Sequence, residues 1–215
     1  MVAPLIRRPA LHLLLNVLLP AAMLALLTGC AQHPPQLAPL APDAVIVAFG
    51  DSLTYGTGAD RQHSYPAELA RLTGRRVINA GVPGELSGAG AERLPAVLAR
   101  YHPDLLVLCH GGNDLLRHRS PDTLAANLVV MLDTARHHKV PVLLLGVPQP
   151  ALFGLHAAPV YERLAERFHV PYDGQILAKL ESHRQWKSDR VHPNGRGYRQ
   201  LADAVYRLLQ RSGAL

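Results

Sequence analysis

The chain has 215 residues, of which 48% are hydrophobic and 18% are charged. This length favours one domain, and the hydrophobic fraction is too low for a protein that crosses a membrane many times. Two cysteines are too few for a disulfide framework or a four-cysteine zinc site. The 22 Lys and Arg residues outnumber the 16 Asp and Glu residues, but they are scattered along the chain. A scattered excess is typical of a solvated surface, so we expect no nucleic-acid partner.

The first 29 residues have the pattern of a secretory signal peptide. Arg7 and Arg8 form a basic start, and residues 11–27 are nearly all apolar but slightly short for a membrane span. The stretch ends in Leu27-Thr28-Gly29-Cys30, which resembles the bacterial lipobox, where the chain is cut before a cysteine that is then lipidated. Two alternatives are an ordinary cleaved signal with a chance cysteine and an uncleaved single-span anchor.

The sequence therefore divides into three predicted parts: a signal peptide at 1–29, lipidated Cys30 with a Pro-rich tether at 30–43, and a folded domain at 44–215. Three acyl chains would hold the mature protein firmly to a membrane. The lipobox resemblance implies a protein of the bacterial cell envelope, anchored on the periplasmic side of the outer membrane. We expect a monomer, although the sequence leaves self-association open.

Short apolar runs alternate with amphipathic segments after residue 42. Pro95 indicates that the second helix begins near Leu94, because proline is tolerated only in the first turn. Alternating strands and helices predict a parallel sheet covered on both faces, which is a three-layer α/β domain. We take its strand order as 2-1-3-4-5, which is the order of a flavodoxin-like sheet. The predicted strands span 45–49, 76–80, 105–109, 142–147 and 170–172, and the predicted helices span 65–72, 94–101, 121–135, 160–168 and 198–209.

Three strand ends carry unusual loops, and ligands bind at such ends in open α/β sheets. Ser52 follows the first strand, Gly81 the second and Asn113 the third. With the order 2-1-3, Gly81 and Asn113 would flank Ser52, each about one 4.8 Å strand spacing away. A hydroxyl between a backbone N–H and a side-chain amide suits acyl transfer, which needs a nucleophile and donors for an oxyanion. We assign residues 146–150, a rigid loop, to the acyl pocket.

Ser52 also needs a base, and His192 is the candidate among 12 histidines. Asp189, three residues earlier, could accept the imidazole Nδ1–H and leave Nε2 facing Ser52. An Asp-x-x-His pair is common and weak evidence alone. The last strand lies about 14 Å from the first in the predicted order, so residues 173–189 must carry the pair back across the sheet.

Four sequence blocks follow one another along the chain: Gly50-Asp51-Ser52-Leu53, Gly81, Gly111-x-Asn113-Asp114 and Asp189-x-x-His192. In type, order and spacing they resemble the GDSL/SGNH hydrolases, and in particular the bacterial thioesterase I, lysophospholipase L1 and arylesterase branch. The likeness extends from residue 44 to about residue 209. It departs from the family pattern at Cys109-His110, where we expect an acidic residue followed by an apolar one.

The resemblance implies a serine esterase that needs no cofactor or metal. Ser52 would be the nucleophile, His192 the general base and Asp189 its orienting partner. The oxyanion hole would consist of the Ser52 N–H, the Gly81 N–H and the Asn113 side chain. Gly81 could instead be only a turn residue, and Asn113 only an Asx-turn residue.

Smaller roles are expected for three neighbours of these residues. Asp114 is interpreted as a structural carboxylate, His110 as a pocket-wall residue and Cys109 as a buried hydrophobe. The expected substrates are short acyl or aryl esters, lysophospholipids or thioesters. One alternative is an O-acetylesterase acting on cell-envelope polysaccharide, and another is a catalytically silent, envelope-binding lipoprotein.

Overall fold

The computed structural model describes residues 34–150 and 154–215, which belong to one compact unit. The predicted signal peptide and the predicted lipidation site, Cys30, lie outside the described residues. Within the described part, no helix combines the length and the hydropathy needed to span a bilayer.

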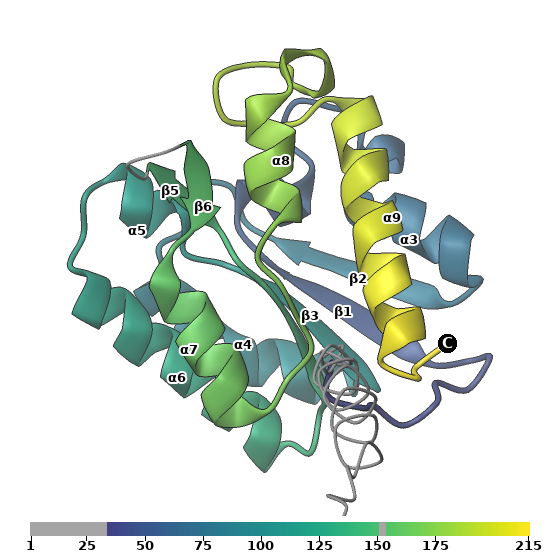
Figure 1. The fold of residues 1–215 in the computed structure, drawn as a ribbon. Coiled ribbons are helices and arrows are strands. Elements are labelled where there is room, and N and C mark those ends of the chain that lie inside the picture. Colours follow the sequence, from purple (N-terminus) through teal and green to yellow (C-terminus); the bar gives the residue numbers. More distant parts are fainter. Residues whose placement is uncertain (1–33, 151–153) are drawn as a thin grey trace, which may run out of the picture. The chain divides into compact units, whose positions relative to one another are not determined.

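A parallel sheet of five strands forms the centre of this unit (Figure 1). Its order is β2-β1-β3-β4-β7, which confirms the predicted order and places the last, two-residue strand at the edge. Gly50, at the end of β1, is paired with Gly81 of β2 and Cys109 of β3. The loops after these three strands therefore leave the sheet side by side. The strands are β1 (Val45–Gly50), β2 (Arg76–Gly81), β3 (Leu105–Cys109), β4 (Val142–Leu145) and β7 (Tyr172–Asp173).

Helices cover both faces of the sheet, as the alternating pattern predicts (Figure 1). On one face α3 (Tyr65–Thr73) packs beside α9 (Gly195–Arg211), and α4 (Ser87–Tyr101), α6 (Pro121–His137) and α7 (Pro159–Phe168) lie on the other. Shorter elements sit in the connecting loops: α2 (Ser52–Tyr55), α5 (Gly112–Leu116), α8 (Ile176–Ser182) and the 3-10 helices η1 (Arg61–His63) and η2 (Arg184–Trp186).

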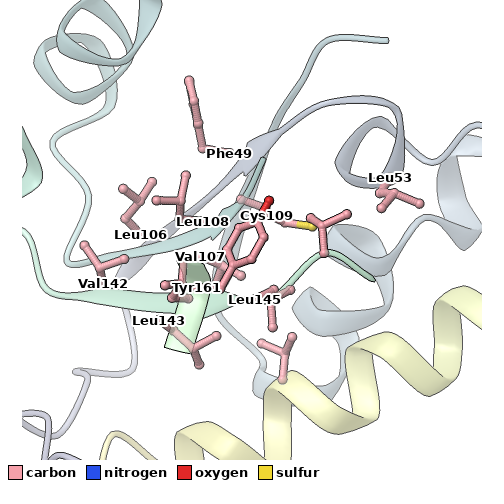
Figure 2. Packing of buried hydrophobic residues seen from close by; sticks show 14 of the residues in the cluster. Phe49, Leu53, Leu106, Val107, Leu108, Cys109, Val142, Leu143, Leu145 and Tyr161 are labelled. Atoms are coloured by element: carbon pink, nitrogen blue, oxygen red, sulfur yellow. The ribbon is translucent and has the colours of Figure 1, made fainter. Parts of the chain in front are cut away.

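The central strands are apolar along their whole length because both faces are covered. Every residue of β3 and β4 is buried. Figure 2 shows Leu106 and Leu108 of β3 packed near Val142 of β4 and Phe49 of β1, with Tyr161 of α7 beside Cys109. This core fixes the strand ends on which the polar loops are built.

Helix α4 begins at Ser87, seven residues before the predicted start, so Pro95 lies inside the helix. The sequence conceals this start because two glycines and a proline lower the helix propensity of the segment. A carboxylate from another part of the chain supplies the cap: Asp114 accepts the Ser87 N–H at 2.8 Å and the Ser87 hydroxyl at 2.6 Å. Asp114 is thereby confirmed as a structural carboxylate.

Residues 146–150, predicted to be a rigid loop, are partly strand. Strand β4 ends at Leu145, and β5 (Pro148–Pro150) then pairs antiparallel with β6 (Leu155–Ala157). Two prolines mask this strand in the sequence because proline is rare in sheets.

The part of the predicted tether from Pro34 onward is docked on the domain. The Leu37 N–H donates to the Ser212 carbonyl at 2.7 Å, and the Leu40 N–H donates to the Ala214 carbonyl at 2.9 Å. Both leucines also pack against the core. The predicted boundary at residue 44 therefore falls inside the compact unit, which begins at Pro34.

Candidate active site

Ser52 is the first residue of α2 and lies directly beyond the end of β1. The preceding residue, Asp51, caps this short helix, because its Oδ1 atom accepts the Leu53 N–H at 3.1 Å. Asp51 is buried, and burial raises the pKa of its carboxyl, against the opposing effects of His110 and nearby N–H groups. Gly50 permits the close approach of β1 and β3 at this point, since a Cβ there would lie 1.9 Å from the Cys109 carbonyl oxygen.

The structure brings Ser52, His192 and Asp189 together. The Ser52 Oγ atom and the His192 Nε2 atom are 3.0 Å apart, and the His192 Nδ1 atom lies 2.8 Å from the Asp189 Oδ2 atom. With the hydrogen on Nδ1, the ring donates to Asp189, and Nε2 is left to accept the serine hydroxyl. The three side chains thus form a continuous hydrogen-bonded chain.

Asp189 is held as an anion by its own loop. Its Oδ1 atom accepts the backbone N–H groups of His192 at 2.7 Å and of Val191 at 2.8 Å. The His192 backbone N–H, the His192 imidazole and the Val191 N–H together lower the pKa of Asp189 to about 2, and they outweigh the opposing effect of burial. The Asp189 side chain is 53% exposed, so solvent screens its charge and its ion pair with His192 adds little to the stability of the fold.

The loop that carries His192 is fastened on both sides. Ser188 donates from its backbone N–H to the His192 carbonyl at 3.0 Å, and Lys187 and Pro193 form an isolated β-bridge. Asn194 caps α9 by accepting the Gly197 N–H, and it donates to the Lys187 carbonyl. These contacts hold the loop in place near Ser52, after the chain has passed the edge strand β7.

The same loop packs closely on the loop that follows α2. Gly58 has φ +94°, and a Cβ at this position would lie 2.1 Å from the Ser188 Oγ atom and 2.7 Å from the Pro193 carbonyl oxygen. Tyr198 of α9 donates from its hydroxyl to the Thr57 carbonyl at 2.7 Å. The segments that hold Ser52 and His192 are therefore in direct contact.

The predicted role of Gly81 as an oxyanion donor does not fit its hydrogen bonding. Its N–H donates to the Asn79 Oδ1 atom at 3.0 Å, so it has no hydrogen left for an oxyanion. Asn79 in turn donates from Nδ2 to the Tyr55 carbonyl at 3.2 Å. A Cβ on Gly81 would lie 2.1 Å from the Tyr55 nitrogen. Gly81 and Asn79 thus hold α2 against β2. The position of Gly81 at a strand end did not indicate this packing role in the sequence.

Asn113 lies in α5, directly after β3, as predicted. Its Nδ2 atom donates to the Glu85 carbonyl at 3.0 Å, and the Val82 N–H donates to the Gly50 carbonyl at 3.0 Å. These bonds fix both ends of the turn between β2 and α4. Gly84, inside this turn, has φ +78°, and its N–H makes no hydrogen bond within the described part of the chain.

His110, predicted to line a pocket wall, is instead fully buried between the sheet and α4. Cys109 is a buried free thiol, as predicted. Across residues 34–150 and 154–215, no cluster of three or more His, Cys, Asp or Glu side chains has the arrangement of a metal site.

The fold and the hydrogen-bonded Ser52, His192 and Asp189 side chains are those expected of a serine hydrolase. A family model described as the GDSL-like lipase/acylhydrolase family matches residues 48–200. The chain belongs to this family and is a carboxylic ester hydrolase.

Individual relatives agree with this assignment. Esterase TesA of Pseudomonas aeruginosa is 37% identical over 124 residues, which are 55% of this chain and 62% of the relative. Thioesterase 1/protease 1/lysophospholipase L1 of Escherichia coli K12 is 30% identical over 79% of this chain and 85% of its own length. The crystal structure of AlinE4, an SGNH-hydrolase family esterase, aligns with a TM-score of 0.62 and 34% identity over 79% of this chain and 96% of that one.

Proposed function

We propose that the chain hydrolyses carboxylic esters through an acyl-enzyme on Ser52, with His192 as general base and Asp189 as its orienting partner. The observation that carries this proposal is the pair of distances on the His192 ring, 3.0 Å to the Ser52 hydroxyl and 2.8 Å to Asp189. A serine is a weak nucleophile unless a neighbouring base takes its proton.

Each step follows from these contacts. The Ser52 Oγ atom attacks the acyl carbon while its proton moves to the His192 Nε2 atom, and the carbonyl oxygen becomes an oxyanion. The imidazolium that forms is stabilised by Asp189, and it returns the proton to the departing alcohol as the ester bond breaks. Water then attacks the acyl-enzyme by the same route, which releases the acid and restores Ser52.

The oxyanion needs donors fixed before the reaction starts. We assign this role to the Ser52 N–H, the Asn113 Nδ2 group and the Gly84 N–H. Gly84 replaces Gly81 because the Gly81 N–H is already bonded to Asn79. Asn113 uses one amide hydrogen on the Glu85 carbonyl and keeps the other for the oxyanion.

Labelling with a fluorophosphonate tests the proposal, since only an activated serine reacts at a useful rate. We expect the wild-type protein to be labelled and Ser52→Ala to be unlabelled and inactive on p-nitrophenyl acetate. Ser182→Ala, which removes an exposed serine of α8, is the matched control and should behave as wild type. An unlabelled wild-type protein would instead support the catalytically silent lipoprotein.

For the substrate, we propose short acyl or aryl esters or lysophospholipids, with thioesters as a further class. The support is the names of the relatives, an esterase and a thioesterase/lysophospholipase. The alternative is an O-acetylesterase of cell-envelope polysaccharide. A series of p-nitrophenyl esters separates these classes, because an acetate preference favours deacetylation and a preference for eight carbons or more favours lipids.

We also propose that Cys30 is lipidated after removal of residues 1–29, which would anchor the enzyme in the bacterial envelope. The support is the lipobox-like sequence ending at Cys30 behind a basic and apolar leader. In cells grown with radioactive palmitate, we expect the wild-type protein to be labelled and Cys30→Ala to be unlabelled. A labelled Cys30→Ala protein would overturn this assignment.

A further inference from the structure

His110 lies at a position where the family resemblance leads us to expect an apolar side chain. It is fully buried, directly after β3, and only one of its two ring nitrogens has a hydrogen-bond partner. That partner is Glu85, whose Oε2 atom lies 3.0 Å from the His110 Nε2 atom. A buried polar side chain needs such a bond, so the pair is a specific feature of this core.

Glu85 is held from two sides. Arg93 of α4 donates from Nε to Oε1 at 2.8 Å and from Nη2 to Oε2 at 2.7 Å, which is a bidentate contact. The Glu85 side chain is only 7% exposed. Burial raises its pKa, but the bonds from His110 and Arg93 outweigh that effect and lower the pKa to about 2. Glu85 is therefore an anion that only accepts hydrogen bonds, and the His110 Nε2 atom carries the hydrogen.

Arg93 also ties this carboxylate to the ends of the strands. Its Nη2 atom donates to the Ala80 carbonyl at 3.1 Å, and its guanidinium lies 4.2 Å from the centre of the Phe49 ring. Glu85 thus has a fixed position relative to β1, β2 and β3.

The backbone of Glu85 belongs to the turn that carries the proposed oxyanion donors. Its carbonyl accepts the Asn113 amide at 3.0 Å, and its N–H closes the turn by donating to the Val82 carbonyl at 3.2 Å. Gly84 is the adjacent residue. A shift of Glu85 would therefore move the Gly84 N–H and release the Asn113 side chain together.

We infer that His110 is a positioning residue of this enzyme: by holding Glu85, it fixes the turn that presents the Gly84 N–H and the Asn113 amide to the oxyanion. This inference rests on the proposed function, because it assumes that those groups bind the oxyanion. His110 itself is buried behind the turn and acts through Glu85.

Gly90 offers a second position at which the inference about His110 can be tested. It lies in α4 against the imidazole, and a Cβ there would be 2.3 Å from the His110 Nε2 atom. The ring is fully buried, so it cannot move aside into solvent. Gly88, two residues earlier in the same helix, is the matched position, because a Cβ there would make only an ordinary 3.6 Å contact with Asn127.

The experiment compares His110→Leu with His110→Gln, whose amide nitrogen can replace the Nε2–H donor. For His110→Leu we expect kcat on a short p-nitrophenyl ester to fall about 10- to 100-fold with KM nearly unchanged, since donors misplaced by about 1 Å can cost that much. The rate of Ser52 phosphonylation by a fluorophosphonate should fall by the same factor, because its phosphoryl oxygen needs the same donors. His110→Gln should recover most of both rates.

Gly90→Ala should lower kcat in the same way, while Gly88→Ala should keep wild-type kcat; this pair also serves if His110→Leu does not fold. Wild-type rates in a folded His110→Leu, or a His110→Gln as slow as His110→Leu, would overturn the inference. The proposed function fails separately, if Ser52→Ala remains active or the wild-type protein is not labelled.

Discussion

The Nε2 atom of His192 lies 3.0 Å from the Oγ atom of Ser52, although 140 positions separate the two residues in the chain. Ser52 is fixed at the start of α2, at the end of a buried central strand, whereas His192 lies in a loop before α9. The contact therefore depends on how firmly that loop is attached. Much of the expected behaviour of variants follows from this asymmetry between a rigid nucleophile and a loop-borne base.

Asp189→Asn should lower kcat about 10³–10⁴-fold with little effect on folding. An amide in place of the carboxylate neither stabilises the imidazolium nor selects the tautomer with Nε2 free. Steady-state hydrolysis of p-nitrophenyl acetate measures the change. Asp122→Asn, at the exposed start of α6, is the control and should match wild type. Full activity in Asp189→Asn would exclude Asp189 from the relay.

Gly58→Ala should reduce both activity and stability, because the new Cβ would be 2.1 Å from Ser188 and 2.7 Å from the Pro193 carbonyl. The clash pushes the His192 loop away from Ser52, and we expect kcat to fall at least tenfold. Gly74→Ala is the matched control: it also has positive φ, +67°, but nothing lies within 4 Å of its Cβ. It should lose about 1 kcal/mol of stability through backbone strain and keep its kcat. Equal kcat values in the two variants would contradict the proposed packing.

Asn113→Ala should lower kcat about 10²–10³-fold, the usual effect of removing one oxyanion donor. KM should change little, because the donor acts mainly on the charge that develops in the transition state. Asn127→Ala removes another partly buried amide, which donates to the Ser87 hydroxyl at 2.9 Å outside the proposed oxyanion hole. It should affect stability more than kcat. If both variants kept wild-type kcat, Asn113 would be only a structural residue.

Glu85 should make the stability of the fold decrease at low pH. Its folded-state pKa, about 2, lies below the ordinary value of 4.5, so the ionised form stabilises the fold above pH 4.5, and this stabilisation is lost as the pH falls through about 2. Glu85→Gln should therefore have a free energy of unfolding in urea that is lower than wild type at pH 7, by on the order of 2 kcal/mol. Between pH 5 and pH 2 its free energy of unfolding should also decline less than that of wild type. Glu166→Gln, exposed on α7, is the control. An unchanged pH dependence in Glu85→Gln would show that the carboxylate is not held as an anion.

Much of the fold follows from local sequence patterns. The strands are short apolar runs that end in glycine or polar residues, and β1 to β4 lie within two residues of their predicted ends. The meeting of the three loops also follows once the strand order 2-1-3 of a flavodoxin-like sheet is taken, because parallel strands share one carboxyl edge. Ser52, Asp189 and His192 could also be singled out from the sequence, because their residue types and spacing match one chemistry.

Tertiary contacts decided the features that no local pattern contains. Helix α4 begins at Ser87 because Asp114, 27 residues later, caps it. His110 has a hydrogen-bond partner in the core because the carboxylate of Glu85, 25 residues earlier, lies beside its Nε2 atom.

Residue types and periodicity determined the sheet and the reacting side chains, because burial and chemistry favour particular residues at each position. The distant partners of polar atoms, such as Asp114 for Ser87 and Glu85 for His110, were decided only by folding, because a hydrogen bond depends on separations of about 3 Å that the sequence does not encode locally.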